Sequence, residues 1–262
     1  MNLLKKIVAK GPRRTSAAVL RRLASAIEPP DLSPFAAPDS IWSDYLKFVS
    51  SATGGWPSQG NIEAMGHAVR HRPSDAAMLE IGTFCGQSSC SLAYLIEKFS
   101  APNPLFTCDI WRYDEGTATP VSSVGDSRSL TFADYNRFIK EGYIRNAKFF
   151  CARTPPHSIE TDSDNFFAQW SRSSAVTDVF GREVRLGGEL SFCFIDGNHS
   201  YENTRRDFEN TDRFLVRGGF ILFDDSADDS PWLDVRKVVG QVLASGNYQL
   251  VRKCPCYLLQ KK

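Results

Sequence analysis

A glycine-containing segment, Glu80-x-Gly82-x-x-x-Gly86-x-Ser88, directly follows an apolar run and has the residue types to hold a small charged ligand. Gly82 ends a predicted strand and Gly86 precedes a predicted helix, so a ligand can approach the backbone at both glycines. The N–H groups and positive dipole end of that helix suit an anion, and Ser88 or Ser89 can cap it. The middle glycine of the G-x-G-x-x-G dinucleotide turn is missing, which favours a smaller zwitterion, such as an amino acid. A purely structural strand-to-helix turn is the alternative.

An acidic residue ends the next apolar run. Asp109 follows Leu105–Cys108 and lies 27 residues after Gly82. An acid at this place in an α/β sheet commonly accepts hydrogen bonds from ribose hydroxyls. A solvated aspartate at a strand end is the alternative, and the preceding glycine turn favours ribose binding.

Three more carboxylates follow two further apolar runs. Asp196 comes after Leu190–Ile195, and Asp224 and Asp225 come after Phe220–Phe223. The carboxyl ends of parallel strands meet at one sheet edge, so we expect these side chains to converge. Converging carboxylates repel one another unless a cation lies between them, and oxygen ligands suit Mg²⁺, Ca²⁺ or Mn²⁺. Ordinary strand-end and helix-capping roles are the alternatives.

His199 lies three residues after Asp196. A neutral imidazole there can take a proton from a substrate hydroxyl whose pKa a metal has lowered. The alternative is a histidine that caps or packs at the start of the next helix.

The elements that must position these residues alternate along the chain. The apolar periodicity predicts strands over 76–81, 105–110, 148–152, 190–195 and 220–223, and helices over 41–50, 61–70, 88–99, 132–141, 159–171, 202–215 and 232–243. Apolar strands separated by amphipathic helices indicate a parallel sheet covered on both faces. Tyr248–Lys253 and Tyr257–Gln260 close the chain as a predicted antiparallel edge, and Ala175–Gly188 is a predicted hairpin.

Length and charge limit the wider interpretation. The 262 residues suit one large α/β domain with decorations or two small domains. With a net charge of +1, the chain as a whole has no strong positive field that would attract nucleic acid. Residues 1–22 hold seven basic and no acidic residues, whereas the rest of the chain holds 24 basic and 30 acidic ones.

The chain is expected to have three parts. Residues 1–28 form a basic helical arm, which is either a solvated or packing segment or a contact for a membrane surface or an acidic partner. Residues 29–59 form a linker and a loop around Trp56 that could cap a site, and residues 60–262 form the main domain, with insertions near 111–130 and 175–188. The seven cysteines and the missing membrane span and signal peptide point to the cytoplasm, with peripheral membrane contact through the arm as an option.

These motifs together resemble class I S-adenosylmethionine-dependent methyltransferases, and most closely the metal-dependent O-methyltransferases of the macrocin and catechol type. The resemblance covers roughly residues 60–260. The segment Glu80–Ser88 is similar to the family's first motif, which holds the methionine end of the cofactor, and Asp109 falls on its ribose-binding acid. The expected fold is a Rossmann-like, seven-stranded, mostly parallel sheet with helices on both faces and its last strand antiparallel.

The resemblance also implies roles for residues near the later strands. Asp196, Asp224 and Asp225 fall on the metal ligands, and His199 falls on the catalytic base. Arg153 and Thr154, after the predicted third strand, fall near the adenine pocket.

The function that follows is methyl transfer from S-adenosylmethionine to a hydroxyl of a small molecule or sugar, assisted by a divalent metal such as Mg²⁺. A sugar hydroxyl on a glycan, glycolipid or secondary metabolite is the leading acceptor by analogy. The alternatives are a Rossmann-like oxidoreductase or hydroxylase-like relative, and a non-catalytic module that recruits a partner through the basic arm. A homo-oligomer is compatible with the sequence.

Overall fold

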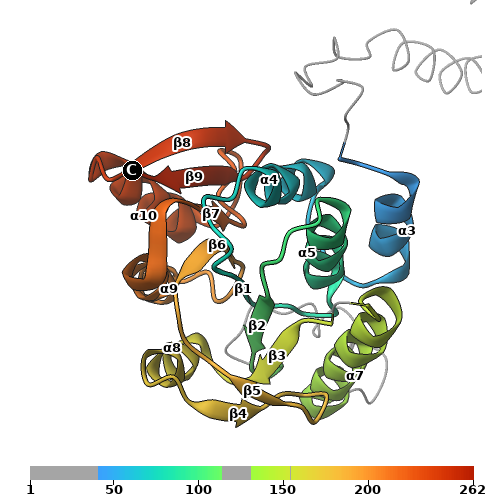
Figure 1. Cartoon of the computed structure of the whole chain (residues 1–262). Coiled ribbons are helices and arrows are strands. Elements are labelled where there is room, and N and C mark those ends of the chain that lie inside the picture. The colour runs from blue at the N-terminus through green and yellow to red at the C-terminus, as the bar shows by residue number, and fades with distance from the viewer. Residues whose placement is uncertain (1–40, 114–130, 154) are drawn as a thin grey trace, which may run out of the picture. The chain divides into compact units, whose positions relative to one another are not determined.

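A seven-stranded sheet forms the centre of the molecule (Figure 1). In sheet order its strands are β3 (His157–Glu160), β2 (Leu105–Asp109), β1 (Ala77–Ile81), β6 (Leu190–Ile195), β7 (Leu215–Phe223), β9 (Tyr257–Lys261) and β8 (Tyr248–Lys253). The first five run parallel, and β9 runs antiparallel to both β7 and β8. The predicted sheet with an antiparallel last strand is therefore confirmed.

This computed structural model describes residues 41–113, 131–153 and 155–262. Residues 41–262 form one compact unit, which includes α3 (Asp44–Ala52) as well as everything from residue 60 onward. The predicted arm over 1–28, most of the insertion near 111–130 and Thr154 lie outside the described residues.

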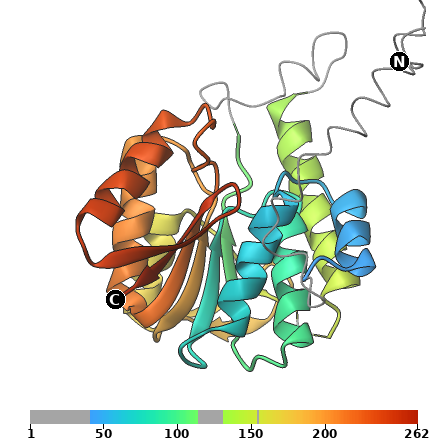
Figure 2. The same cartoon turned by 90° about the horizontal axis from the view of Figure 1, so that it is seen from above.

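Helices cover both faces of the sheet (Figure 2). One face carries α3, α4 (Gln59–Arg70), α5 (Gln87–Lys98) and α7 (Phe132–Phe150), and the other carries α8 (Ser163–Ser171), α9 (Tyr201–Phe214) and α10 (Leu233–Ala244). Successive strand residues point to opposite faces, so Met78 packs under α4 and α5 while Leu79 packs under α8 to α10. Both faces of β1 and β6 are buried, which explains why their residues are apolar except for Glu80 and Ser191.

The predicted third strand is wrong. Residues 148–150 form the last turn of α7, and the third strand is His157–Glu160. Thr131 and Asp134 form a capping box that starts α7, and Ile139, Tyr143 and Ala147 recur at helical spacing on its buried face. Because this face keeps the helix packed along its length, Phe149 and Phe150 at its end are helical although they look like strand residues locally.

The predicted helix over 159–171 begins later, at Ser163. Asp162 is its N-cap, and its side chain accepts a hydrogen bond from the Asn165 amide at 2.8 Å. The residues just before this cap belong to β3 instead. The polar residues from Glu160 to Asn165, which include this N-cap, mark the boundary between strand and helix that the prediction missed.

The predicted hairpin over 175–188 is confirmed as β4 (Ala175–Thr177) and β5 (Glu183–Arg185). The Val179 amide in its turn donates to the Ser158 carbonyl of β3 at 2.9 Å. Buried Asp178 in the same turn pairs with Arg182 at 2.6 Å. The insertion thus covers the outer edge of β3, a structural role that shields an exposed strand edge.

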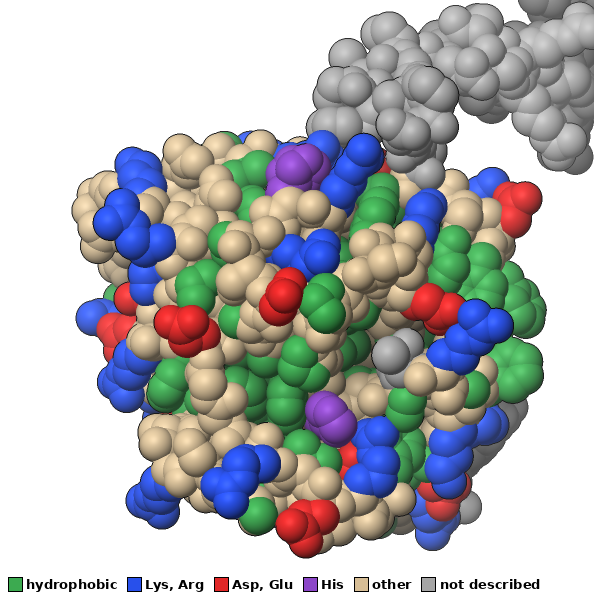
Figure 3. Space-filling model, in the orientation of Figure 1, with side chains coloured by type: hydrophobic (Ala, Val, Ile, Leu, Met, Phe, Trp, Pro, Cys, Tyr) green, Lys and Arg blue, Asp and Glu red, His purple; other side chains and the backbone are tan. Residues whose placement is uncertain are grey.

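Charges are interspersed on the face drawn in Figure 3. Lys and Arg side chains alternate there with Asp and Glu side chains, and this face has no continuous basic field among the residues described.

A buried acid ties α8 to α9 and makes stability depend on pH. Asp207 is 3% exposed, accepts a hydrogen bond from the Ser163 hydroxyl at 2.5 Å, and has its pKa raised to about 7 by burial. Because the folded carboxyl holds its proton more tightly than the unfolded one, its stabilising contribution is complete below about pH 4 and is lost as the pH rises to about 7. We expect Asp207→Asn to gain stability over the wild type on the order of 3 kcal/mol between pH 4 and 7. Urea unfolding across this range measures the difference, and parallel curves would contradict it.

Candidate active site

The turn after β1 is pressed against the loop after β6. Gly82 has φ +83°, and a Cβ built there would lie 2.0 Å from the carbonyl oxygen of Asp196. The Gly82 and Asp196 amides donate to strand carbonyls, at 2.9 Å to Cys108 and 2.8 Å to Ile81. The glycine is therefore required by close packing of two loops, and the expectation that it also admits a ligand to the backbone stays a prediction.

The helix after this turn, α5, begins without a side-chain cap. Its N-cap is Gly86, with φ +92°, and no side chain accepts from the first turn. Ser88 and Ser89 lie inside the helix, so the expectation that either one caps it is wrong. The first-turn N–H groups and the dipole end of α5 are left to receive an anionic group.

Glu80 is fully buried below this turn. Burial raises its pKa to about 7, although hydrogen bonds from the Ser88 and Ser89 hydroxyls lower it. Ser89 donates to Oε2, whereas Oε1 has no hydrogen-bond partner among the described residues. An unpartnered buried carboxylate oxygen is costly and suits the ammonium group of an amino-acid ligand.

Asp109, the predicted ribose-binding acid, holds the same turn in place. Its Oδ2 accepts from the Thr83 amide at 2.7 Å, the Thr83 hydroxyl at 3.1 Å and the Phe84 amide at 3.0 Å. Its Oδ1 accepts from the Trp111 amide at 2.6 Å. Burial raises the pKa of Asp109 and these four hydrogen bonds lower it. Oδ1 keeps acceptor capacity for a hydroxyl, and ribose binding stays a prediction.

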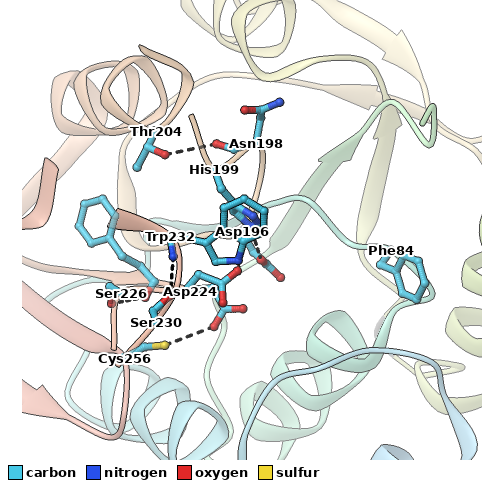
Figure 4. A network of polar contacts seen from close by, with 12 residues as sticks. Phe84, Asp196, Asn198, His199, Thr204, Asp224, Ser226, Ser230, Trp232 and Cys256 are labelled. Atoms are coloured by element: carbon cyan, nitrogen blue, oxygen red, sulfur yellow. Dashed lines mark hydrogen bonds and ion pairs between the residues drawn. The ribbon is translucent and has the colours of Figure 1, made fainter. Parts of the chain in front are cut away.

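Two acids and a histidine meet at the ends of β6 and β7 (Figure 4). His199 Nε2 lies 3.1 Å from Asp225 Oδ2 and 3.9 Å from Asp196 Oδ1, and one ligand atom from each residue lies within 4.8 Å of the others. Asp225 has φ +51°, a left-handed conformation that is uncommon outside glycine. Side-chain exposures of 25% to 34% leave the group open to a substrate. We call Asp196, His199 and Asp225 the acid–histidine cluster.

Asp224 lies beside the cluster but is turned towards α4. Its Oδ1 accepts from Asn61 Nδ2 at 2.6 Å and from the Cys256 thiol at 3.5 Å. Asn61 is 2% exposed and its own Oδ1 is unpartnered among the residues described. The three predicted metal ligands are thus brought together, with His199 in the innermost group and Asp224 held at its side. Asn61 and Cys256 belong to no motif, and no sequence signal pointed to them.

Like charges and burial set the electrostatics of the cluster. Burial is the largest cause raising the pKa of Asp196, and Asp224 and Asp225 raise it further. Burial also raises the pKa of Asp225 and takes that of Asp224 to about 6. Burial lowers the pKa of His199, against the opposing effect of Asp225, so its imidazole favours the neutral form. The carboxylates repel one another when ionised, and a divalent cation between them would remove that repulsion. Carboxylate oxygens and a neutral imidazole nitrogen are ligands that fit such a cation.

Comparison with known proteins identifies the family. A family model described as a methyltransferase domain matches residues 79–226, more than half of the chain and the whole interval from Leu79 in β1 to the residue after Asp225. The chain belongs to this methyltransferase family. No relative was found among curated protein sequences.

Solved structures share the fold of this methyltransferase. Calicheamicin methyltransferase CalS11 is 15% identical over 99% of this chain and 97% of its own, with a TM-score of 0.51. The SAH-bound methyltransferase PaMTH1 of Podospora anserina is 13% identical over 97% of each chain, with a TM-score of 0.52. The O-methyltransferase TomG of Streptomyces achromogenes, solved with SAM, is 12% identical over 94% of this chain and 96% of its own, with a TM-score of 0.50.

Arg153 does not join the site of the methyltransferase. Its side chain is 85% exposed and pairs at 2.8 Å with Glu97, in the last turn of α5. Because the third strand starts at His157, Arg153 precedes this strand and lies at the amino-terminal edge of the sheet. The adenine role expected for it is therefore wrong. Thr161 and Asp162 follow β3 at the correct edge, where the Thr161 amide donates to the Asp109 carbonyl at 3.1 Å.

The contact between Asn61 and Asp224 gives a test of this arrangement in the methyltransferase. Asn61→Asp places a second carboxylate opposite Asp224, where the two side chains now meet at 2.6 Å. We expect the free energy of unfolding to fall by about 2 kcal/mol or more at pH 8. Asn61→Asp combined with Asp224→Asn exchanges amide and carboxylate, and we expect it to restore most of the loss. Chemical unfolding of both single variants and the double variant measures the coupling. An additive double variant would show that the contact does not form.

Proposed function

We propose that this protein is an S-adenosylmethionine-dependent O-methyltransferase that acts on a hydroxyl of a small molecule or sugar. One observation carries the proposal. A site for an amino-acid zwitterion, formed by Glu80 and the uncapped start of α5, adjoins a cluster of acids and a histidine through the contact of Gly82 with Asp196. The PaMTH1 structure, which is SAH-bound, and the TomG structure, which is in complex with SAM, support the choice of cofactor.

The cofactor's methionine end fits the first turn of α5. The amide groups after Gly86 would receive its carboxylate, and Glu80 Oε1 would receive its ammonium group. Asp109 stiffens the turn through its four hydrogen bonds and would offer Oδ1 to a ribose hydroxyl. When bound, S-adenosylmethionine supplies a methyl group with its own leaving group.

His199 would act as the base. Its Nε2 is buried against Asp225 and Asp196 while the side chain as a whole is 27% exposed, so a substrate hydroxyl that reaches Nε2 between these acids can pass its proton to the ring. Asp225 would then stabilise the imidazolium that forms. Trp232, whose ring centroid is 4.5 Å from that of His199, limits the ring's orientation.

Asp196, Asp224 and Asp225 would hold a divalent cation, with Mg²⁺ as our choice. A bound cation lowers the pKa of a coordinated hydroxyl and stabilises the alkoxide. A single Nε2 cannot bind the cation and accept the proton at the same time, so we assign His199 to the proton and the carboxylates to the metal.

Cofactor binding tests the proposal directly. We expect Glu80→Gln to weaken S-adenosylhomocysteine binding about tenfold to a hundredfold, because the buried ammonium loses its charged partner. Glu97→Gln, at the far end of the same helix, is the matched control and should bind as the wild type does. Isothermal titration calorimetry measures both. Failure of the wild type to bind, or binding of NAD in its place, would contradict the proposal and favour the oxidoreductase alternative.

Metal removal tests the assistance by a cation. We expect Asp225→Asn to weaken Mg²⁺ binding at least about tenfold, while His199→Gln retains it and loses methyl transfer. Calorimetric titration with MgCl₂ and methyl transfer from labelled S-adenosylmethionine, with and without EDTA, provide the readouts. Full activity in EDTA would exclude the metal role, and loss of Mg²⁺ binding in His199→Gln would make the histidine a ligand.

Other expectations stay predictions. None of the helices in the described part of the chain is both long and apolar enough to span a bilayer. Contact of the basic arm, residues 1–28, with a membrane surface or an acidic partner is untested, as are a cytoplasmic location and homo-oligomerisation.

A further inference from the structure

Trp56 is a large aromatic side chain left in water on a firmly held loop. It is 70% exposed, between α3 and α4. Gln87, the first residue of α5, donates from Nε2 to the Pro57 carbonyl at 3.3 Å and to the Ser50 hydroxyl at 3.1 Å. A Cβ on Gly55 would lie 2.7 Å from the Gln87 side chain, so the loop packs directly against the start of α5. The loop is thus fastened to the helix turn assigned to the cofactor.

One face of the Trp56 ring is backed by the cofactor turn. Its centroid lies 4.8 Å from that of Phe84. Phe84 is itself fixed, because its amide donates to Asp109 at 3.0 Å and its carbonyl accepts from Trp111 Nε1 at 3.0 Å. The rings of Tyr113 and Tyr135 lie 6.5 Å and 6.4 Å from Phe84. An indole that packs against Phe84 and is otherwise exposed offers its free surface for a ligand ring to stack on.

This aromatic group borders the acid–histidine cluster. Figure 4 shows Phe84 on the side of Asp196 away from Trp232. Tyr113, next to Phe84, lies close enough to Asp196 for the carboxylate to contribute to its raised pKa, although burial is the main cause. In this view the cluster lies between the Trp232 backbone and Phe84, the ring against which Trp56 packs.

We propose that Trp56 stacks on the pyranose ring of a carbohydrate acceptor. The axial face of a pyranose carries C–H groups of slight positive charge, which suit the negative face of an indole, while its rim of hydroxyls stays hydrated. A one-sided, open platform matches such a ring, whereas a flat aromatic acceptor gains more from an enclosed slot. His199, which the proposed function assigns to the proton, can accept a hydrogen bond from one hydroxyl of that rim. The inference rests on the proposed function and specifies its substrate class.

The test uses saturation-transfer NMR on the full-length protein saturated with S-adenosylhomocysteine and Mg²⁺. The probes are the methyl glycosides of glucose, galactose, mannose and rhamnose, with catechol as the competing aromatic class. We expect at least one glycoside to receive saturation at its C–H face, Trp56→Ala to raise its Kd about tenfold, and Trp56→Phe to retain part of the affinity. Phe149→Ala, which removes another aromatic side chain of 71% exposure from the far end of α7, is the matched control.

The outcomes separate this inference from the proposed function. If S-adenosylhomocysteine does not bind to the wild type by calorimetry, the proposed function fails. If it binds but no glycoside does, if catechol alone binds, or if Trp56→Ala leaves the glycoside Kd unchanged, the assignment of Trp56 is overturned while the proposed function stands. Unchanged S-adenosylhomocysteine affinity in Trp56→Ala is also expected, and its loss would make Trp56 a cofactor contact instead.

Discussion

The contact between Gly82 and the Asp196 carbonyl is the constraint on which the rest of the site depends. The turn after β1 packs so closely against the loop after β6 that Gly82 cannot carry a side chain. A Cβ on Gly82 would lie 2.0 Å from that oxygen. This contact brings together two loops that are separated by more than a hundred residues of chain. One loop leads to the start of α5 and the other carries Asp196 and His199. A shift at this point would separate the proposed cofactor from the proposed base.

Buried acids surround this contact, and each has a different set of partners. Asp109 accepts four hydrogen bonds, three from the turn after β1 and one from the Trp111 amide. Asp224 is held by Asn61 and Cys256. Glu80 keeps one oxygen without a partner among the described residues, and the remaining pair of acids face His199 across 3.1 Å and 3.9 Å. Asp109 and Asp224, which have internal partners, hold the framework and keep part of their acceptor capacity for a ligand, whereas the unpartnered oxygen of Glu80 marks a place where a ligand belongs.

Two segments outside the central sheet also differ in this respect: one supports the fold, and we propose the other for ligand binding. The β4–β5 hairpin, one of the two predicted insertions, covers the edge of β3 and shields it. The short loop that carries Trp56 is mounted on Gln87 and Phe84 and leaves its indole in water. A long insertion can therefore support a sheet edge, whereas the exposed ring on the short loop is the one that we propose for the acceptor.

The sequence by itself determined the sheet, its parallel core, the antiparallel last strand and the acids that end β1, β2, β6 and β7, because fully buried strands must be apolar and their ends must be polar. It misplaced the third strand and with it Arg153, since Phe149 and Phe150 look like a strand locally and only the packing of α7 shows them to be helical. The folded chain alone shows that His199 joins Asp196 and Asp225 in one group, while Asp224, beside them, is also held by Asn61. The direction in which a carboxylate points depends on partners such as Asn61, which lies 163 residues away in the chain and carries no local signal. Strand ends are specified by local composition, whereas side-chain orientation at those ends is specified by contacts that form only when distant segments meet.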